Sequence, residues 1–253
     1  MPWEREPLVG QLERKFDSLG ISGLLFDLDD TLLETTAYMK ERKLALAIWA
    51  AGKLGLPLDL VMDELDEAAH EAYDVLHVSA ERWVLAVQLT AIKLTGDSYA
   101  LNEGIGLIQE LFFDSPEIIS GIHPVMNLFE QTGIKMAVVT HAPSTLPWSD
   151  WTWIKLQKTG LDRYFSQVWI ADESKPKGIE DWRGAADLLQ VPCENILGFG
   201  DNVNADGLPM LSLSMRVIMV EPKWRKSNGD LPAGIPVLAS LVDAPEAILS
   251  LQR

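Results

Sequence analysis

Cysteine is nearly absent from this sequence. The 253 residues include a single cysteine, Cys193, so the chain cannot form an intramolecular disulfide. This excludes the small secreted scaffolds that depend on disulfides, and it favours a reducing, cytoplasmic location. The first residues, MPWEREPLVG, contain no basic segment followed by an apolar run, so we expect no signal peptide.

Positive charge and long apolar runs are scarce as well. The chain has 21 Lys and Arg residues against 37 Asp and Glu residues, which gives a formal net charge of −16. A field of this sign repels nucleic acids and anionic membrane surfaces, so we expect neither as a partner. No run of about 18 uncharged apolar residues is present, so no helix is expected to cross a membrane. An anionic substrate would need a local cation or a bound metal ion.

What the sequence does contain is the alternating pattern of an α/β protein. Hydrophobic residues make up 47% of the chain and charged residues 23%, which is typical of a folded globular protein. Short apolar runs separated by helical patterns predict a doubly wound parallel sheet of the Rossmann-like kind. The predicted strands are Gly23–Leu28, Lys135–Thr140, Val168–Ala171, Ile196–Phe199, Arg216–Val220 and a last one near Val237.

Residues 34–121 interrupt this alternation. Apolar residues recur there at three- and four-residue spacing, and no strand pattern is present. The predicted helices are Tyr38–Leu54, Asp59–Leu76, Ala80–Leu94 and Tyr99–Phe113. We therefore expect an α/β core formed by residues 1–33 and 122–253, and an inserted all-helical domain formed by residues 34–121. The stretch Glu221–Pro236, rich in Pro, Gly and charge, predicts a long surface loop.

The stretch Leu24–Leu33, LLFDLDDTLL, carries the strongest chemical signal. Its apolar run predicts a buried strand, and three carboxylates follow directly, those of Asp27, Asp29 and Asp30, and then Thr31. Carboxylates crowded at a strand end repel one another and lose water, which costs free energy unless a cation joins them. Asp-Asp-Thr is also common in turns and helix caps, so the motif alone allows both interpretations.

Polar residues also follow later predicted strands or precede a predicted helix. They are Thr140-His141, Lys175-Pro176-Lys177, and Asp201 with Asp206 five residues on. Each has an ordinary alternative: a helix cap for Thr140, surface charge for Lys175, and a turn for the Gly-Asp-Asn run. Because the carboxyl ends of parallel strands meet at one edge, we expect them in one place. Together they provide a nucleophile, a hydroxyl, an ammonium and carboxylates for a divalent cation.

In this order the motifs resemble those of the haloacid dehalogenase superfamily of phosphohydrolases, in the branch with a helical C1-type cap inserted after the first motif. The resemblance covers the chain from about Gly23 to the last helix. The motif Asp-x-Asp-x-Thr is met by Asp27, Asp29 and Thr31, and the Thr or Ser that ends a strand is met by Thr140. The Lys that is commonly followed by Pro is met by Lys175-Pro176, and the final Gly-Asp with a second acid is met by Gly200-Asp201 and Asp206.

The resemblance implies a role for each residue. Asp27 would be the nucleophile that forms an aspartyl-phosphate, and Asp29 would be the acid for the leaving alcohol and then the base for water. Mg²⁺ would be held by Asp27, Asp201 and the backbone carbonyl of Asp29. Asp206 would bind the metal or its water, or orient Lys175. The residues expected to bind the phosphate are Thr140, His141 and Lys175. His141 stands where many members have Asn, so simple packing is its alternative, and Lys177 competes with Lys175.

We therefore expect a Mg²⁺-dependent phosphatase that hydrolyses a small phosphorylated metabolite, as a monomer or homodimer. Asp29 favours phosphoryl transfer over cleavage of a carbon–halogen bond, because a halide leaves without a proton. Two alternatives stay open. One is a phosphomutase of the same architecture, and the other is a non-catalytic phospho-acceptor or regulatory protein.

Overall fold

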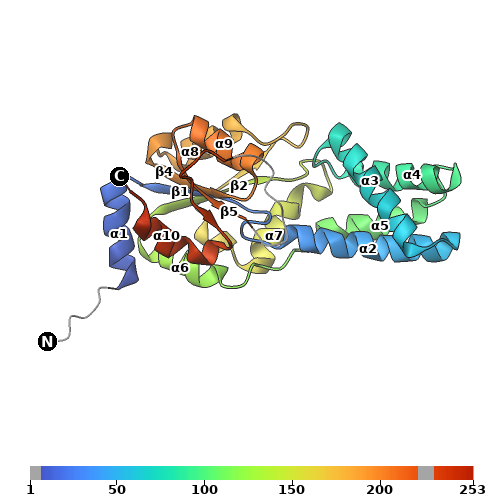
Figure 1. Ribbon diagram of the computed structural model, residues 1–253, viewed down its shortest axis with the longest axis horizontal. Helices are drawn as coiled ribbons and strands as arrows, with labels where there is room; N and C mark the ends of the chain where they lie inside the picture. Colours follow the sequence, from blue (N-terminus) through green and yellow to red (C-terminus); the bar gives the residue numbers. More distant parts are fainter. Residues whose placement is uncertain (1–6, 222–230, 253) are drawn as a thin grey trace.

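A central parallel sheet organises the fold (Figure 1). The computed structural model describes residues 7–221 and 231–252, and within them six strands run parallel in the order β3-β2-β1-β4-β5-β6. They are β1 Gly23–Asp27, β2 Lys135–His141, β3 Gln167–Ala171, β4 Ile196–Gly200, β5 Arg216–Val220 and β6 Val237–Leu238. Every residue of β1 and of β4 is buried, as expected for strands covered on both faces.

The pairing register brings the carboxyl ends of the three central strands together. In β1, Phe26 lies beside Val138 of β2 and Phe199 of β4, and Asp27 lies beside Val139. The polar residues that follow these positions therefore emerge side by side at one edge of the sheet.

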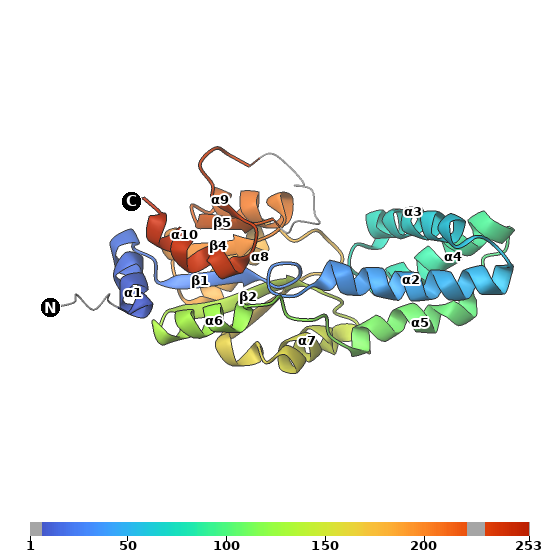
Figure 2. The same cartoon turned by 60° about the horizontal axis from the view of Figure 1, so that its bottom comes forward.

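Helices cover both faces of the sheet. One face carries α1, α6, α7 and α10, and the other carries α8 and α9 (Figures 1 and 2). Their bounds are α1 Leu8–Leu19, α6 Ile122–Gln131, α7 Trp151–Thr159, α8 Ile179–Leu189, α9 Leu208–Ser212 and α10 Ala244–Ser250. Leu24 and Phe26 of β1 pack in the hydrophobic cluster between the sheet and the first group of helices. Leu25 packs in the cluster between the sheet and α8 and α9, which is the two-residue alternation of a strand.

The helices inserted between β1 and α6 project beyond the sheet, and we call residues 34–121 the cap (Figure 2). The cap contains α2 Thr35–Leu54, α3 Leu58–Leu76, α4 Glu81–Thr95 and α5 Ile105–Gln109. It has a hydrophobic cluster of its own, which includes Leu65, Trp83 and Phe112. The same cluster takes in Trp151 at the start of α7, so one helix of the core is packed into the cap.

The structure confirms the predicted fold class, a doubly wound parallel sheet with an inserted helical cap. The prediction of one continuous helix over Tyr99–Phe113 is wrong. The segment contains the short α5, with 3₁₀ helices at Asn102–Gly104 and Glu110–Phe113 on either side of it. Gly104 lies against Trp49, where a Cβ would come within 2.5 Å of the ring. Of the predicted loop Glu221–Pro236, residues 222–230 lie outside the described residues. No helix in the described part is both long and apolar enough to cross a membrane.

Candidate active site

Most of the residues predicted for the site surround one hollow at the carboxyl edge of the sheet. The hollow has a volume of about 170 Å³. Tyr73 of the cap helix α3 also lines it, so the cap forms part of its wall. The predicted site residues that line the hollow are Asp27, Asp29, His141, Asp201 and Asp206.

Three carboxylates form a compact cluster in this hollow. Asp27 and Asp206 are buried and Asp201 is half-buried, and one ligand atom of each lies within 4.8 Å of the others. Thr31 donates its hydroxyl to Asp27 Oδ2 at 3.1 Å. The β1 and β4 strand ends and the turn after β4 thus converge as the sequence predicts.

Lys177 is the cation of this cluster. Its buried ammonium forms ion pairs with Asp27 and, at 2.7 Å, with Asp206 Oδ1. Burial raises the pKa of Asp27 to about 7, with further increases from Asp206 and Asp29, although Lys177 acts in the opposite direction. Burial acts to lower the pKa of Lys177, but the two carboxylates outweigh it and hold that pKa above its usual value. The ammonium therefore stays charged while Asp27 is poised between its two forms near neutral pH.

The donor set fits a hard divalent cation. Asp27, Asp201 and Asp206 offer only oxygen atoms, as Mg²⁺ prefers, and their spacing allows all three to face one ion. Lys177 pairs with Asp27 and Asp206 in a mostly buried place, and the carboxylates of the cluster repel one another there. A divalent cation would offset that repulsion and would favour the ionised form of Asp27.

Gly200, the last residue of β4, makes room for Asp206. A Cβ on Gly200 would lie 2.5 Å from the Cβ of Asp206 and 2.6 Å from its Oδ2. Gly200→Ala is therefore expected to displace Asp206, to lower the free energy of unfolding by about 1–3 kcal/mol, and to weaken Mg²⁺ binding about 10-fold or more. Urea unfolding and calorimetric titration with Mg²⁺ measure the two effects.

The matched control for this variant is Gly52→Ala, at an exposed position of α2 where a Cβ meets nothing within 4 Å. It is expected to leave Mg²⁺ binding unchanged, because Gly52 lies far along the cap helix from the cluster. An unchanged Mg²⁺ affinity in Gly200→Ala would contradict the assigned packing of Asp206.

Asp29 lies beside this cluster but has different partners. Lys155 of α7 donates to both carboxylate oxygens of Asp29 at 2.8 Å, Thr35 donates at 2.6 Å, and Thr140 donates at 3.2 Å. Burial acts to raise the pKa of Asp29, but the Lys155 charge and the hydrogen bonds from Lys155 and Thr35 outweigh it, so the pKa is held below its usual value. Asp29 is thus an anchored carboxylate, whereas Asp27 is poised near neutrality.

Lys155 is a residue that the sequence analysis missed. A signal was available in the spacing of α7, where the buried residues are Trp151, Thr152, Lys155 and Leu156. A lysine on the buried stripe of an amphipathic helix requires an anionic partner, because an unpaired buried ammonium is very costly. The helical pattern identified the stripe, but it did not identify the carboxylate that the lysine reaches.

Lys175 does not lie where it was predicted. Its side chain is exposed, whereas the side chain of Lys177 is buried against Asp27 and Asp206, so the preference for the Lys-Pro position was wrong in geometry. The physical reason is the turn that begins at Asp172, whose carboxylate accepts from the Ser174 amide and hydroxyl. The chain returns to the site at Lys177, and the next residue, Gly178, leads into α8.

Thr140 and His141 take separate positions at the end of β2. Thr140 is fully buried, and its hydroxyl is donated to Asp29. His141 lines the hollow, and its Nε2 lies 2.9 Å from the carbonyl oxygen of Asp172. Burial is the main cause that lowers the pKa of His141 below its usual value, which favours the neutral ring. The contact with phosphate predicted for both residues stays a prediction.

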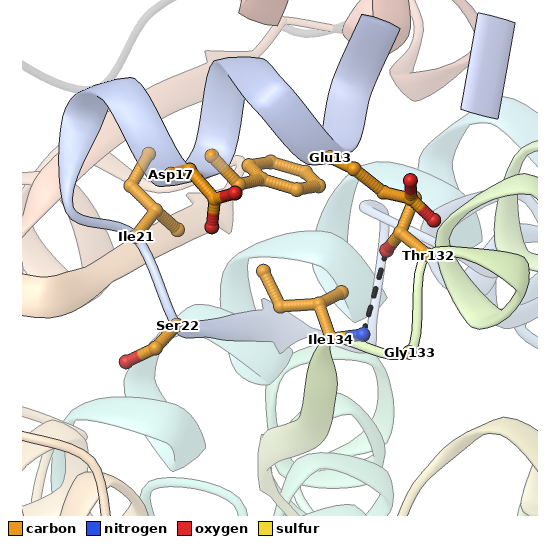
Figure 3. A pocket seen from close by; sticks show the side chains of 8 residues that line it. Glu13, Asp17, Ile21, Ser22, Thr132, Gly133 and Ile134 are labelled. Atoms are coloured by element: carbon orange, nitrogen blue, oxygen red, sulfur yellow. Dashed lines mark hydrogen bonds between the residues drawn. The ribbon is translucent and has the colours of Figure 1, made fainter. Parts of the chain in front are cut away.

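A second hollow, of about 400 Å³, lies at the opposite edge of the sheet (Figure 3). Its lining comes from α1 and from the segments that precede β1 and β2, including Glu13, Asp17, Ser22 and Thr132. The amide of Ile134 donates to the Thr132 hydroxyl at 3.4 Å in the turn before β2. None of the motif residues reaches this amino-terminal edge, so the chemistry is assigned to the carboxyl edge.

Comparison with known proteins finds one family model and a set of solved structures of similar fold. The family model described as haloacid dehalogenase-like hydrolase matches residues 21–212. A search of curated proteins finds no match.

Among solved structures, a haloacid dehalogenase-like family hydrolase from Xanthomonas campestris is 17% identical with a TM-score of 0.68, covering 92% of each chain. A HAD phosphatase from Thermococcus onnurineus is 19% identical with a TM-score of 0.60, covering 90% of this chain and 98% of that one. A 2-haloacid dehalogenase from Pseudomonas syringae pv. Tomato DC3000 is 20% identical with a TM-score of 0.60, covering 91% and 98%. At these identities the likeness establishes the fold.

Proposed function

The chain belongs to the haloacid dehalogenase-like hydrolases, and from this premise we propose that it is a Mg²⁺-dependent phosphatase acting on a small phosphorylated metabolite. One observation carries the proposal. The hollow that contains the Asp27, Asp201 and Asp206 cluster is also lined by Asp29, two residues after Asp27. This arrangement supplies both a nucleophile beside a cation site and a separate carboxylate for proton transfer.

The proposed reaction has two steps. A carboxylate oxygen of Asp27 attacks phosphorus, the bond from phosphorus to the ester oxygen breaks, and Asp29 gives that oxygen a proton. Asp29 then takes a proton from water, whose oxygen attacks phosphorus and releases phosphate from Asp27. Asp29 is anchored as a carboxylate in the free protein, so the proton that it gives is one that it takes up from solvent when the substrate's negative charge enters the site.

Other residues assist these steps. Lys177 balances charge on Asp27 and on the transferring phosphoryl group, in place of Lys175. Asp27, Asp201 and Asp206, with the Asp29 carbonyl, would hold Mg²⁺, which when bound stabilises negative charge on the phosphoryl oxygens. Thr140 and His141 are the proposed hydrogen-bonding groups for phosphate. A hollow of about 170 Å³ suits a phosphoryl group and a few more atoms, which favours a small substrate.

Asp29 also bears on the choice between phosphatase and dehalogenase. A halide leaves with its electron pair and needs no proton, so a dehalogenase gains nothing from a carboxylate two residues after the nucleophile. Nor does halide displacement require the three-carboxylate cluster. A phosphomutase would use the same residues and differ only in where the phosphoryl group goes, and a phospho-acceptor would stop after the first step.

The test is a screen of phosphate monoesters, once with Mg²⁺ and once with chelator. The Mg²⁺ concentration is about 5 mM, enough to fill a weak protein site. We expect phosphate release from at least one class of metabolite, reduced about 100-fold or more by chelator and restored by Mg²⁺. The same samples are assayed for halide released from 2-haloacids, for sugar phosphate isomers, and for phosphoprotein that does not turn over. Metal-independent halide release, isomer without phosphate, or a stable phosphoprotein would each overturn the proposal.

A further inference from the structure

We propose that Lys155 is a positioning residue for Asp29, which holds the carboxylate of the proton donor at one place between the core and the cap. This inference rests on the proposed phosphatase function, in which Asp29 transfers the proton. Lys155 does not line the hollow, and its ion pair is with Asp29, so its role is exerted through Asp29.

The contacts of Lys155 leave Asp29 little freedom. The lysine is completely buried, and its Nζ lies 2.8 Å from both Oδ1 and Oδ2 of Asp29, so it bridges the carboxylate. The Asp29 side chain is 24% exposed, toward the hollow. Without the bridge, a partly exposed carboxylate could turn about its side-chain bonds, and transfer of a proton requires a donor within hydrogen-bond reach of the leaving oxygen.

The helix that carries Lys155 is fixed against the cap. Lys155 Nζ lies 4.1 Å from the centre of the Trp151 ring, one helical turn earlier. Trp151 packs edge-on against Phe112 with ring centres 5.1 Å apart, and its indole N–H donates to the Asp114 carbonyl at 2.9 Å. Phe112 and Asp114 belong to the segment by which the chain passes from the cap back to the core. Lys155 therefore links Asp29 to one of the two segments that connect the cap with the core, which we call the cap connections.

The other cap connection also holds Asp29. Thr35 is the first residue of α2, and its hydroxyl donates to Asp29 Oδ1 at 2.6 Å. The neighbouring Thr36 instead holds Asp30, through its amide at 2.8 Å and its hydroxyl at 2.6 Å. Asp29 is therefore held from both connections at once, by Lys155 and by Thr35. This explains why a lysine outside the hollow can determine where the proton donor stands.

The experiment compares two esters whose leaving groups differ in their need for a proton. With Mg²⁺ present, kcat/KM is measured for phenyl phosphate, whose leaving oxygen needs a proton, and for p-nitrophenyl phosphate, whose leaving oxygen needs none. Lys155→Met is expected to lower kcat/KM for phenyl phosphate about 100-fold and for p-nitrophenyl phosphate less than about 3-fold, because the loss of position outweighs the easier protonation of Asp29 that follows removal of the Lys155 charge. A merely structural lysine would lower both values equally, because loss of folded protein affects every substrate alike.

The control on the same helix is Lys158→Met. Lys158 is also paired with a carboxylate, that of Asp114 at 2.8 Å, but it is about half exposed. It is expected to leave the ratio of the two esters unchanged. In the Asp29→Asn background, Lys155→Met is expected to cause no further change of the ratio, because the residue through which it acts is gone.

A second variant covers the case in which Lys155→Met does not fold. Thr35→Val removes a hydrogen bond to Asp29 and no charge, and it is expected to shift the ratio about 5-fold in the same direction. Thr36→Val, which acts on Asp30, is its control. Equal losses on both esters in Lys155→Met and Thr35→Val would overturn the assignment of Lys155 alone. A wild-type protein that releases phosphate from no monoester of the screen, these two esters included, would overturn the proposed function itself, and the assignment with it.

Discussion

Asp27→Asn is expected to lower phosphate release at least about 10⁴-fold while the protein stays folded, because the amide cannot act as the nucleophile. The fold should tolerate the change, since Asn has nearly the same shape and Lys177 keeps its ion pair with Asp206. The substitution also removes a carboxylate that burial and its acidic neighbours disfavour in the ionised form. The measurements are kcat/KM on the best ester of the screen and thermal unfolding with and without Mg²⁺.

The control for this variant is Asp17→Asn, at an exposed position of α1 beside the amino-terminal hollow. It makes the same change of charge and shape at the opposite edge of the sheet, so activity should be unaffected. If Asp27→Asn kept more than about a hundredth of wild-type activity with an unchanged melting temperature, the covalent mechanism would be wrong.

The carboxylates of the site could be predicted because parallel strands obey a strict geometry. Asp27, Thr140 and Asp201 each lie within one residue of the end of a strand. Once the sheet is predicted, these ends must meet at one edge. Asp29 follows two residues after Asp27, and Asp206 lies in the π-helical turn Val203–Gly207 just after β4, so their placement was constrained as well.

The lysines could not be predicted in the same way, because their side chains are long and their backbones lie outside the strands. Lys175 and Lys177 are two residues apart on a loop, and only the turn at Asp172 decides which of them enters the hollow. Lys155 reaches Asp29 from a helix 126 residues away in the chain. Neither strand register nor helical periodicity contains that information.

The pKa values of Asp27 and Asp29 could not be predicted from the sequence either. The sequence places Asp27 and Asp29 two residues apart and gives no reason to distinguish their ionisation. In the structure Asp27 shares one ammonium with Asp206, whereas Asp29 has the whole of Lys155 and two hydroxyls. Their pKa values are therefore displaced in opposite directions, and this separation depends on which lysine reaches which carboxylate.

Lys177→Met is expected to lower phosphate release about 10³-fold, whereas Lys175→Met leaves it unchanged. Both variants remove one positive charge from the same loop, two residues apart. Only Lys177 is buried beside the nucleophile, so only its removal leaves Asp27 and Asp206 without their ammonium. The pair of variants thus tests the corrected position of the site lysine against the position predicted from the Lys-Pro pattern.

Lys177→Met should also lower the free energy of unfolding by about 3–5 kcal/mol in chelator, because it breaks a buried ion pair. The pKa of Asp27, about 7, lies above its ordinary value of 3.8, so the folded protein keeps a proton that the unfolded chain gives up. Stability from this group therefore falls as pH rises between those values. Without Lys177 the pKa rises further and the fall extends above pH 7. Urea unfolding should show a larger loss at pH 8 than at pH 6. An equal loss at both values, or a loss of activity in Lys175→Met as large as in Lys177→Met, would reject Lys177 as the cation of the cluster.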